Sequence, residues 1–266
     1  MFIKIVNQRP DRILLHLISY FLRLTLVCGA IVALSACSVG DPTALVNDPH
    51  ETANRRVHAF NKGLDRNVLR PAGQVAAATP DAFTVPISNF ADNAGMPSAV
   101  ANGLLQGNIG GAATNTMRFV VNSTVGVGGL FDPASAIGLQ EDDTDFGETL
   151  AVWGVGEGAY IELPVFGPST QRDAVGTLVD LVFDPLDSTG HDIQQDYSGI
   201  SRGLGLAITR GLFSDTFDGL LYESADSYSQ TRLAYLQNRR FELGETTPVN
   251  QEIDPFADDL SLEGFE

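Results

Sequence analysis

The apolar residues of this chain recur at helical rather than strand spacing. One run places apolar side chains at i, i+3, i+4 and i+7, which is a single face of a helix: Val175, Leu178, Val179 and Val182. The opposite face of the same run is polar: Asp173, Thr177, Asp180 and Asp184. Alternation typical of strands is scarce, and its best example, residues 159–164, is short. The chain therefore predicts a mainly α fold built from amphipathic helices.

Further helical segments follow from the same spacing. One begins near Glu51 and carries three apolar residues on one face: Phe60, Leu64 and Val68. Residues 197–221 are apolar but are interrupted by glycines, so we expect two helices or one kinked helix there. Residues 222–243 have the composition of an ordinary polar helix.

Polar residues form only narrow stripes on these apolar helices. Around the apolar stretch 117–121 the stripe consists of Asn115, Arg118 and Asn122. In an ordinary helical domain the apolar faces pack together and such stripes meet water. In a membrane-associated protein some apolar faces touch lipid and some stripes line an interior passage. The spacing alone favours the ordinary domain but leaves both arrangements open.

The N-terminus has the features of a bacterial export signal. Basic residues precede the apolar run 24–34, which is too short to cross a bilayer core of about 30 Å. The run ends in Leu-Ser-Ala-Cys, which is similar to the lipobox of bacterial lipoprotein precursors. We therefore expect a signal peptide over residues 1–36 and a lipid anchor on Cys37. Cys28 does not meet the same requirement, because the bulky Val27 precedes it.

The rest of the chain divides by composition. Residues 37–47 predict a short tether, and residues 48–243 predict a single helical domain. Residues 244–266 contain many acidic residues and no Lys or Arg, which is typical of a disordered tail. No stretch after Cys37 has the ~18 consecutive apolar residues of a membrane-spanning helix.

The net charge of the chain argues against several classes of partner. A net charge of −17 argues against nucleic acid, which requires a basic face, and against electrostatic attraction to anionic lipid. Contact with a membrane must then rely on apolar surface or on a covalent anchor. If Cys28 leaves with the signal and Cys37 is acylated, no thiol remains for a disulfide, a metal or a nucleophile.

No motif of nucleotide, metal or catalytic chemistry is complete. The run Gly154–Gly158 reads G-x-G-x-G and lacks the spacing and the lysine of phosphate-binding loops, so we expect no nucleotide. Residues 141–148 place their glycine one position late for a calcium loop, which leaves at most weak surface binding of an ion. His50 and His58 have no third ligand nearby, and no serine lies in a hydrolase motif. We expect no enzyme activity, no metal and no cofactor.

Four blocks of sequence, in a fixed order, carry a resemblance to a known family. They are residues 48–71 with their Asp-Pro, Asn-Arg, Phe-Asn and Arg-Pro elements, residues 102–134 with Leu-Leu-Gln-Gly and Asn-Ser-Thr, residues 145–173, and residues 234–240. Together they resemble the MlaA/VacJ family of outer-membrane phospholipid-transport lipoproteins. Ala159 and Ser227 depart from the family pattern, because proline is common at both positions.

The resemblance implies a ring of amphipathic helices in the inner leaflet of the outer membrane around a central polar channel. From the glycines we also expect a short Gly-rich hairpin in this single domain. The resemblance further implies a periplasm-facing lipoprotein, anchored at Cys37, that removes mislocalised phospholipid from the outer leaflet. The resemblance also implies that the lipid passes to a periplasmic carrier of the Mla pathway, which maintains lipid asymmetry, and that the protein associates with a trimeric porin. The alternative is a structural lipoprotein that braces a porin without transporting lipid.

The stripes and the resemblance together give candidate residues for the channel or its gate: Gly154, Gly156, Gly158, Asn115, Arg118, Asn122, Arg172 and Asp173. We expect Arg118 or Arg172 to contact an anionic head group, unless each forms an ordinary salt bridge. The glycines predict a flexible hairpin beside the channel mouth, or only a turn. Thr170 and Asp173 have the spacing of a capping box and predict the start of the helix that follows.

A second set of residues is expected to orient the first helix at the membrane: Asn54, Arg55, Phe60, Asn61, Arg70 and Pro71. Deletion of Phe60 and Asn61 would rotate the following helix by about half a turn, because each residue adds about 100°. The lipid-facing and channel-facing sides would then be confused.

Overall fold

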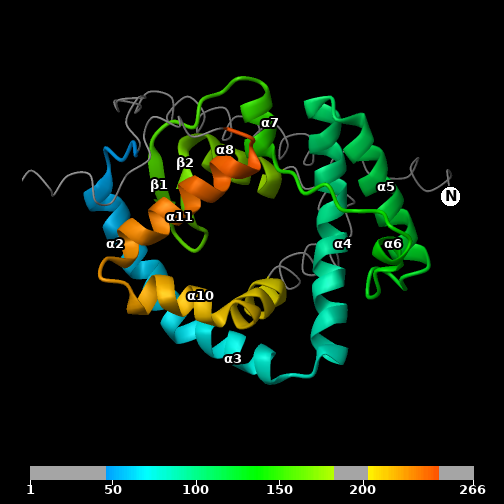
Figure 1. The fold of residues 1–266 in the computed structure, drawn as a ribbon, viewed down its shortest axis with the longest axis horizontal. Coiled ribbons are helices and arrows are strands. Elements are labelled where there is room, and N and C mark those ends of the chain that lie inside the picture. Colours follow the sequence, from blue (N-terminus) through cyan, green and yellow to red (C-terminus); the bar gives the residue numbers. More distant parts are fainter. Residues whose placement is uncertain (1–45, 183–202, 246–266) are drawn as a thin grey trace, which may run out of the picture.

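The computed structural model describes residues 46–182 and 203–245. Within these ranges the chain is mainly helical, as predicted, with one two-stranded sheet. Figure 1 shows the elements following one another around a ring. Residues 1–36, Cys37, most of the tether 37–47 and nearly all of the tail 244–266 lie outside the described residues, so the predictions for them stay predictions.

One side of the ring is a single helical path with a π-helical segment in its middle. α2 (Glu51–Leu64) leads into η2 (Asp65–Leu69) and then into α3 (Arg70–Ala78), which confirms the predicted start near Glu51. Pro71 accounts for the wider segment, because it has no N–H to donate and its ring would collide with the carbonyl four residues back in a regular α-helix. The N–H of Arg70 donates to the carbonyl of Asp65, five residues earlier.

The opposite side of the ring is a helical hairpin that the helical spacing did not predict as a whole. α4 (Asp81–Gln106) packs along α5 (Ile109–Thr124), and the short α6 (Pro133–Ala136) follows. Gly107 makes the turn between them with a left-handed φ of 77°. The side chain of Asn108 caps α5 by accepting from the N–H of Gly111.

The two sides are joined by a helix, a β-hairpin and a second helix. These are α7 (Phe146–Val152), β1 (Tyr160–Leu163), β2 (Gly167–Thr170) and α8 (Gln171–Val182). The strands are antiparallel, with Tyr160 opposite Thr170. β1 confirms the strand expected at residues 159–164, whereas β2 was not predicted. The hydroxyl of Thr170 accepts from the N–H of Asp173 at 3.2 Å, which confirms the capping box at the start of α8.

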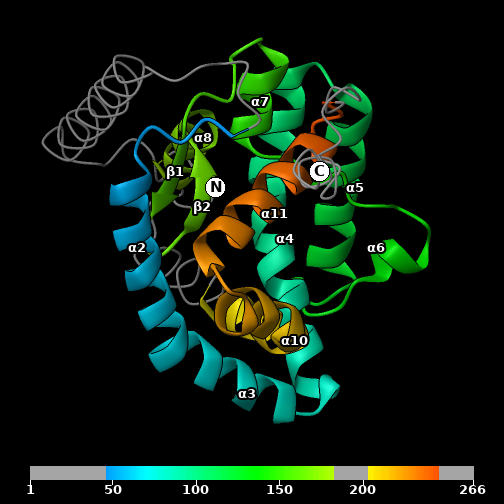
Figure 2. The ribbon, with the colours of Figure 1, turned by 60° about the vertical axis from the view of Figure 1, so that its left-hand side comes forward.

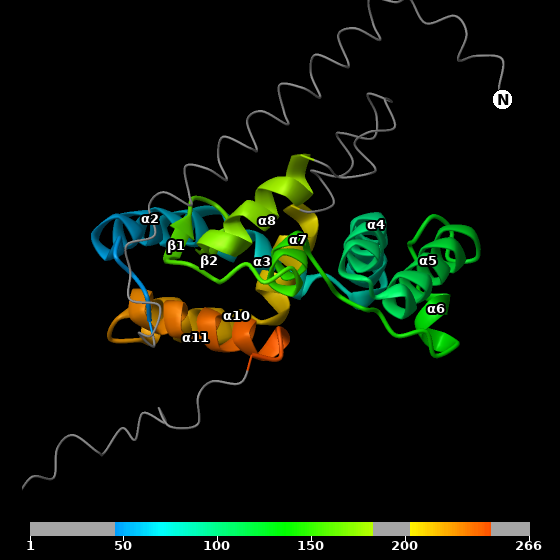
Figure 3. The same cartoon turned by 90° about the horizontal axis from the view of Figure 1, so that it is seen from above.

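The last helices form a separate layer. Residues 203–212 are helical, and α10 (Ser214–Asp218), η4 (Gly219–Glu223) and α11 (Ser227–Glu242) follow. The break expected within residues 197–221 falls at Phe213, and α11 is the predicted polar helix, with a later start. Figure 2 shows α10 next to α3, and Figure 3 shows α10 and α11 below α2, the hairpin and α8. Gly211 lies against α3, and a Cβ at this position would lie 2.5 Å from the carbonyl oxygen of Gly73.

Both faces of α8 are partly buried, because Val175 on the apolar face is buried as well as Asp173 on the polar face. Leu178, also on the apolar face, is 41% exposed. Another element bonds to the polar stripe: the N–H of Phe146, on α7, donates to the carboxylate of Asp180 at 3.0 Å. Asp184, expected on the same stripe, lies outside the described residues. None of the helices within residues 46–182 and 203–245 is long and apolar enough to cross a membrane.

Candidate functional site

The described part of the chain buries polar side chains and exposes apolar ones. Among residues 46–182 and 203–245, buried polar and charged side chains outnumber buried apolar ones. Large apolar side chains are exposed on most of the helices, for example Phe60, Val68, Val75, Leu105, Ile109, Met117, Val120, Leu206 and Leu212. Exposed apolar surface of this extent marks contact with another apolar body. The distribution therefore fits the membrane-associated arrangement better than the ordinary helical domain.

Two asparagines of α2 hold the β-hairpin. Asn54 donates to the carbonyl of Tyr160 at 3.1 Å and accepts from the N–H of Glu162 at 3.1 Å. Asn61 donates to the carbonyl of Leu163 at 2.9 Å and accepts from the N–H of Val165 at 2.8 Å. Each side-chain amide thus bonds the hairpin backbone as a neighbouring strand would. Since the two asparagines are about two helical turns apart, they fix the hairpin along one face of α2.

The tip of the hairpin is apolar and strained. Val165 has a φ of 74°, a left-handed conformation that β-branched residues rarely adopt. Val165 and Phe166 are also exposed, with 57% and 59% of their surface accessible. The two bonds with Asn61 hold this backbone in place, so the tip keeps two exposed apolar side chains in a fixed position.

A buried polar cluster ties the hairpin to α2 and α11. The Tyr160 hydroxyl donates to Glu162 at 2.5 Å, and the other carboxylate oxygen lies 3.2 Å from Nδ1 of His58. The second ring nitrogen of His58 lies 3.1 Å from the hydroxyl of Ser227. Burial raises the pKa of Tyr160, and the bond to Glu162 raises it further, so the phenol stays protonated and keeps donating.

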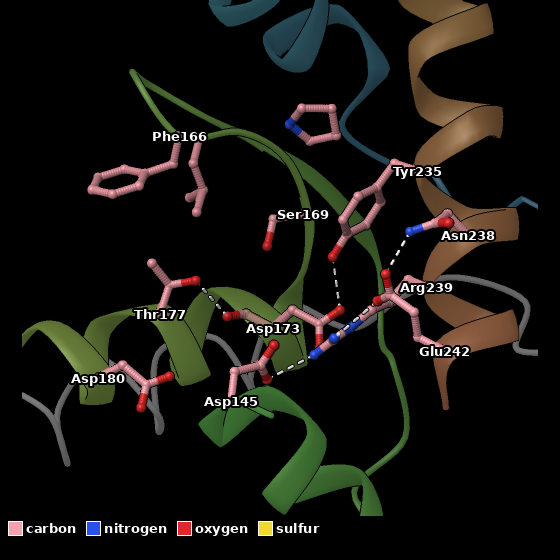
Figure 4. A pocket seen from close by; sticks show the side chains of 12 residues that line it. Asp145, Phe166, Ser169, Asp173, Thr177, Asp180, Tyr235, Asn238, Arg239 and Glu242 are labelled. Carbon is pink, nitrogen blue, oxygen red and sulfur yellow. Dashed lines mark hydrogen bonds and ion pairs between the residues drawn. The ribbon is translucent and has the colours of Figure 1, made fainter. Parts of the chain in front are cut away.

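A pocket of about 310 Å³ lies between the hairpin, α8 and α11 (Figure 4). Its apolar wall consists of Leu163, Phe166 and Pro168. The other lining residues are polar: Asp145, Ser169, Asp173, Thr177, Asp180, Tyr235, Asn238, Arg239 and Glu242. Figure 4 shows Tyr235 and Arg239 pointing from α11 towards Asp173, with Phe166 across the pocket.

The pocket is acidic, and carboxylates surround its cation. Arg239, the only Lys or Arg among the lining residues, lies 2.7 Å from Asp145 and 3.3 Å from both Asp173 and Glu242. Burial alone would raise the pKa of Asp173, but Arg239, Arg172 and the Tyr235 hydroxyl outweigh it and hold that pKa below its usual range. The one cation among the lining residues is therefore already paired with carboxylates and is not available to bind an anionic group.

The comparison with protein families covers nearly all of the described residues. The family model described as MlaA lipoprotein matches residues 46–242. The chain belongs to the MlaA lipoprotein family.

Named relatives of this MlaA-family chain match it over most of its length. The intermembrane phospholipid transport system lipoprotein MlaA of Shigella flexneri is 33% identical over 252 residues, which cover 88% of this chain and 95% of that protein. An uncharacterised protein of Rickettsia typhi is 41% identical over 135 residues, which cover 50% of this chain and 54% of that protein. The chain thus matches about half the length of the Rickettsia relative.

A solved structure has a fold similar to that of this chain. It comes from work on the structural basis for maintenance of bacterial outer membrane lipid asymmetry. It superposes with a TM-score of 0.61 at 34% sequence identity and covers 74% of this chain and 98% of that one.

The polar stripe of α5 in this MlaA-family chain faces a loop of the chain itself. Asn115 exchanges two hydrogen bonds with the backbone of Asp142, at 2.8 and 3.1 Å. Arg118 donates to the carbonyl of Leu139 at 2.5 Å and pairs with Asp132 at 3.2 Å. Asn122 donates to Asp132 at 2.9 Å. All three stripe residues are buried, and Figure 1 shows α5 and α6 on the far side of α4 from the centre of the ring. Their assignment to a channel wall stays a prediction, and their observed contacts are with this loop.

Arg172 and Asp173 lie together at the buried start of α8. Arg172 pairs with Asp173 at 3.2 Å and with Glu245 at 3.3 Å, and only 2% of its side chain is exposed. These contacts fit the ordinary salt bridge, which was the alternative to a contact with a lipid head group.

The glycines before the hairpin have separate structural roles. Gly154 ends α7 with a φ of 86°, and the N–H of Val155 donates to the carbonyl of Leu150 at 2.9 Å, as in a Schellman motif. Gly158 has a φ of 74°, and a Cβ there would lie 2.6 Å from the side-chain oxygen of Gln171. Gly156 has neither constraint. All three precede the hairpin, whose turn lies at residues 164–166, and the gate stays a prediction.

The remaining candidates of the first helix form pairs or face outward. Arg55 pairs with Asp226 at 2.8 Å and with Glu51 at 2.7 Å, and Arg70 pairs with Asp218 at 2.6 Å. Phe60 is 56% exposed, and Pro71 is exposed at the end of the π-helical segment. Their role in orienting the helix at a membrane stays a prediction.

Sequence reasoning missed an ion cluster where the α2–α3 path meets α10. Asp65 accepts two hydrogen bonds from Arg210, at 2.7 and 3.1 Å, and one from the Tyr222 hydroxyl at 2.8 Å. Asp218 accepts from Arg210 at 2.5 Å and from Arg70 at 2.6 Å. The Asp and Arg-Pro elements of the first sequence block are the signal that could have pointed to this cluster.

Proposed function

We propose that this MlaA-family lipoprotein removes mislocalised phospholipid from the outer leaflet of the outer membrane and passes it through a polar channel to a periplasmic carrier of the Mla pathway. It sits in the inner leaflet, is anchored by the lipid on Cys37 and associates with a trimeric porin. The observation that carries the proposal is the inverted surface: large apolar side chains are exposed on a ring of helices, and the buried side chains are more often polar than apolar.

This distribution suits the chemistry of a phospholipid. Moving a charged head group through hydrocarbon costs several kcal/mol or more unless polar partners or water accompany it. A ring with an apolar exterior lowers the free energy of residing in the leaflet, and a polar interior lowers the barrier for the head group. Lipid that moves down its own gradient needs no nucleotide at this step.

The names of the relatives support the same reading. The Shigella relative is a lipoprotein of an intermembrane phospholipid transport system, and the similar solved structure concerns outer-membrane lipid asymmetry. We assign the protein no catalytic step, because its role is to move a lipid without changing a covalent bond.

Surface phospholipid in a strain lacking this gene tests the proposal. We expect phospholipid to accumulate in the outer leaflet and to return to the normal level with a wild-type copy. A Cys37→Ala copy should fail, because one anchor is lost. A Cys28→Ala copy should restore the normal level, because that cysteine leaves with the signal. Equal surface phospholipid with and without the gene would contradict the proposal.

Purified protein separates the proposal from its alternatives. Full-length lipoprotein in vesicles should transfer intact phospholipid to a soluble lipid carrier. Binding to a porin without any transfer would favour the structural lipoprotein, and release of free fatty acid would favour a hydrolase.

A further inference from the structure

Three cations of the α2–α3 path surround one aromatic ring. The charged groups of Lys62, Arg66 and Arg70 lie 5.4, 5.5 and 4.8 Å from the ring centre of Tyr222. In a regular α-helix, residues four apart drift by about 40° per step, so three such residues would spread over about 80°. The π-helix at Asp65–Leu69 takes more residues per turn and removes this drift. The wider turn therefore brings the three cations to one place.

Two of these cations have no carboxylate partner within the described ranges. Arg70 is paired with Asp218, and both Asp65 and Asp218 are paired with Arg210. Lys62 donates only to a hydroxyl, that of Ser227 at 3.3 Å, and Arg66 is exposed. The cluster thus keeps a local surplus of positive charge in a chain whose net charge is −17. An anion is the partner that such a surplus attracts.

The same helix presents apolar side chains on another face. Phe60 and Val68 are 56% and 53% exposed. Phe60 and Lys62 are two residues apart, so their side chains point about 200° away from each other around the helix axis. The α2–η2 path therefore separates an apolar side from a cationic side, which is the division between the acyl chains and the phosphate of a phospholipid.

We propose that Lys62 and Arg66, whose charged groups lie 5.4 and 5.5 Å from the ring centre of Tyr222, form a binding site for the phosphate of a phospholipid head group. Ammonium and guanidinium groups make strong charge-assisted hydrogen bonds to phosphate oxygens. Arg70 and Tyr222 are positioning residues: Arg70 is held by Asp218, and the Tyr222 hydroxyl donates to Asp65, so the ring stays in place beside Lys62 and Arg66. This site takes the role that the sequence suggested for Arg118 and Arg172, which the structure pairs with other residues.

This inference deepens the proposed function and rests on it. Its test is the affinity of the full-length lipoprotein in detergent for dihexanoylphosphatidylglycerol, measured by calorimetry. The comparison probes are dihexanoylglycerol, which lacks the phosphate, and inorganic phosphate. A Lys62→Gln/Arg66→Gln variant should bind the phospholipid at least about tenfold more weakly, because it loses two charge-assisted hydrogen bonds to the phosphate. The charge-preserving Lys62→Arg/Arg66→Lys variant should keep the affinity.

Arg56→Gln is the matched control, because Arg56 is an exposed cation on α2 outside the cluster, and its affinity should equal that of the wild type. Thermal unfolding of every variant shows that each is folded. Equal affinity of the double glutamine variant and the wild type would overturn the site. Equal binding of dihexanoylglycerol would exclude recognition of the phosphate, and equally tight inorganic phosphate would assign the cations to a free ion rather than a lipid.

Surface phospholipid in cells distinguishes a failure of this site from a failure of the proposed function. If the double glutamine variant restores normal surface phospholipid as fully as the wild type, the site is wrong and the transport function stands. If the wild type restores nothing, the transport function fails whatever the affinity for short-chain lipid.

Discussion

Arg210 makes a bidentate ion pair with Asp65, which lies 145 residues earlier in the chain. Its Nε donates to one carboxylate oxygen at 2.7 Å and an Nη to the other at 3.1 Å, and both side chains are buried. Asp65 lies in the π-helix and Arg210 in the last helical layer, so the pair fixes one side of the ring to the layer below it. The bidentate geometry is the strongest form of such a pair.

Removal of one partner of this pair should be costly. We expect Asp65→Asn to lower the free energy of unfolding by about 3 kcal/mol, because a buried Arg210 would lose one of its two carboxylates. Glu51→Gln, which removes an exposed pair with Arg55, should cost less than about 0.5 kcal/mol. Urea titration of the purified lipoprotein in detergent measures both. Similar costs for the two variants would mean that the buried pair does not hold the layers together.

The bonds between Asn61 and the hairpin tip predict a functional effect at this residue. Asn61→Ala removes both bonds to the strained turn, whereas Asn67→Ala removes only one local bond within the helical path. We expect raised outer-membrane permeability to a large antibiotic for Asn61→Ala and normal permeability for Asn67→Ala. Deletion of Phe60 and Asn61 should be more severe, because it also turns Asp65 by about 200° away from Arg210. Wild-type permeability of the deletion variant would refute a role for this helix.

Substitution of Gly156 tests whether the glycine-rich segment is a flexible gate or only a turn. Alanine at Gly154 or Gly158 is strained by the left-handed backbone, by about 1 kcal/mol or more, so those variants mix strain with lost flexibility. Alanine at Gly156 meets no atom within 4 Å and has no such strain, so it removes only backbone freedom. If the segment gates lipid passage, Gly156→Ala should raise surface phospholipid with no loss of thermal stability. Normal surface phospholipid would show that the segment is only a turn.

Asp132 predicts how stability depends on pH. Burial would raise its pKa, but the hydroxyl and N–H of Ser135 and the amide of Asn122 donate to it, and Arg118 lies beside it, so its pKa falls to about 2. Because the folded pKa lies below the ordinary value of 3.8, Asp132 stabilises the fold above about pH 4, and this contribution disappears as the pH falls towards 2.

The measurement is the midpoint of thermal unfolding of the wild type and of Asp132→Asn between pH 6 and pH 2. The wild type should be more stable at pH 6, and the difference should shrink through the window from about pH 4 to pH 2. A difference that stays constant over this range would show that the charge of Asp132 does not contribute.

Local features of the fold could be predicted from the sequence because local residues decide them. The start of α2, the capping box of Thr170 and Asp173, and the strand at Tyr160 each depend on neighbours in the chain. β2 was missed because Gly-Pro-Ser-Thr has no strand-forming pattern, and it is paired only because β1 lies beside it. α4 contains Pro86 and Pro97, which normally indicate a helix end rather than an interior.

The direction of the polar stripes could not be predicted from the sequence. Periodicity identifies two faces of a helix but does not say which one meets water when lipid is a possible solvent. In α8 the polar stripe is buried at Asp173 and bonded to α7 through Asp180, and in α5 the stripe is covered by residues 132–142 of the same chain. The pair of Asp65 and Arg210 and the cations around Tyr222 depend on contacts between segments distant in sequence. They also depend on a π-helix, and Pro71 alone indicates an irregular helix but not its type.

Depth in the bilayer is the most direct test of the inverted surface. A nitroxide can be attached at Phe60→Cys on the apolar side of the α2–η2 path and at Arg66→Cys on the cationic side, in a full-length lipoprotein carrying Cys28→Ala. The relaxation of each label by oxygen and by a water-soluble nickel complex then reports its surroundings in vesicles. We expect the label at position 60 to be accessible to oxygen and shielded from nickel, and the label at position 66 to be accessible to nickel. Equal access of nickel to both labels would contradict the account.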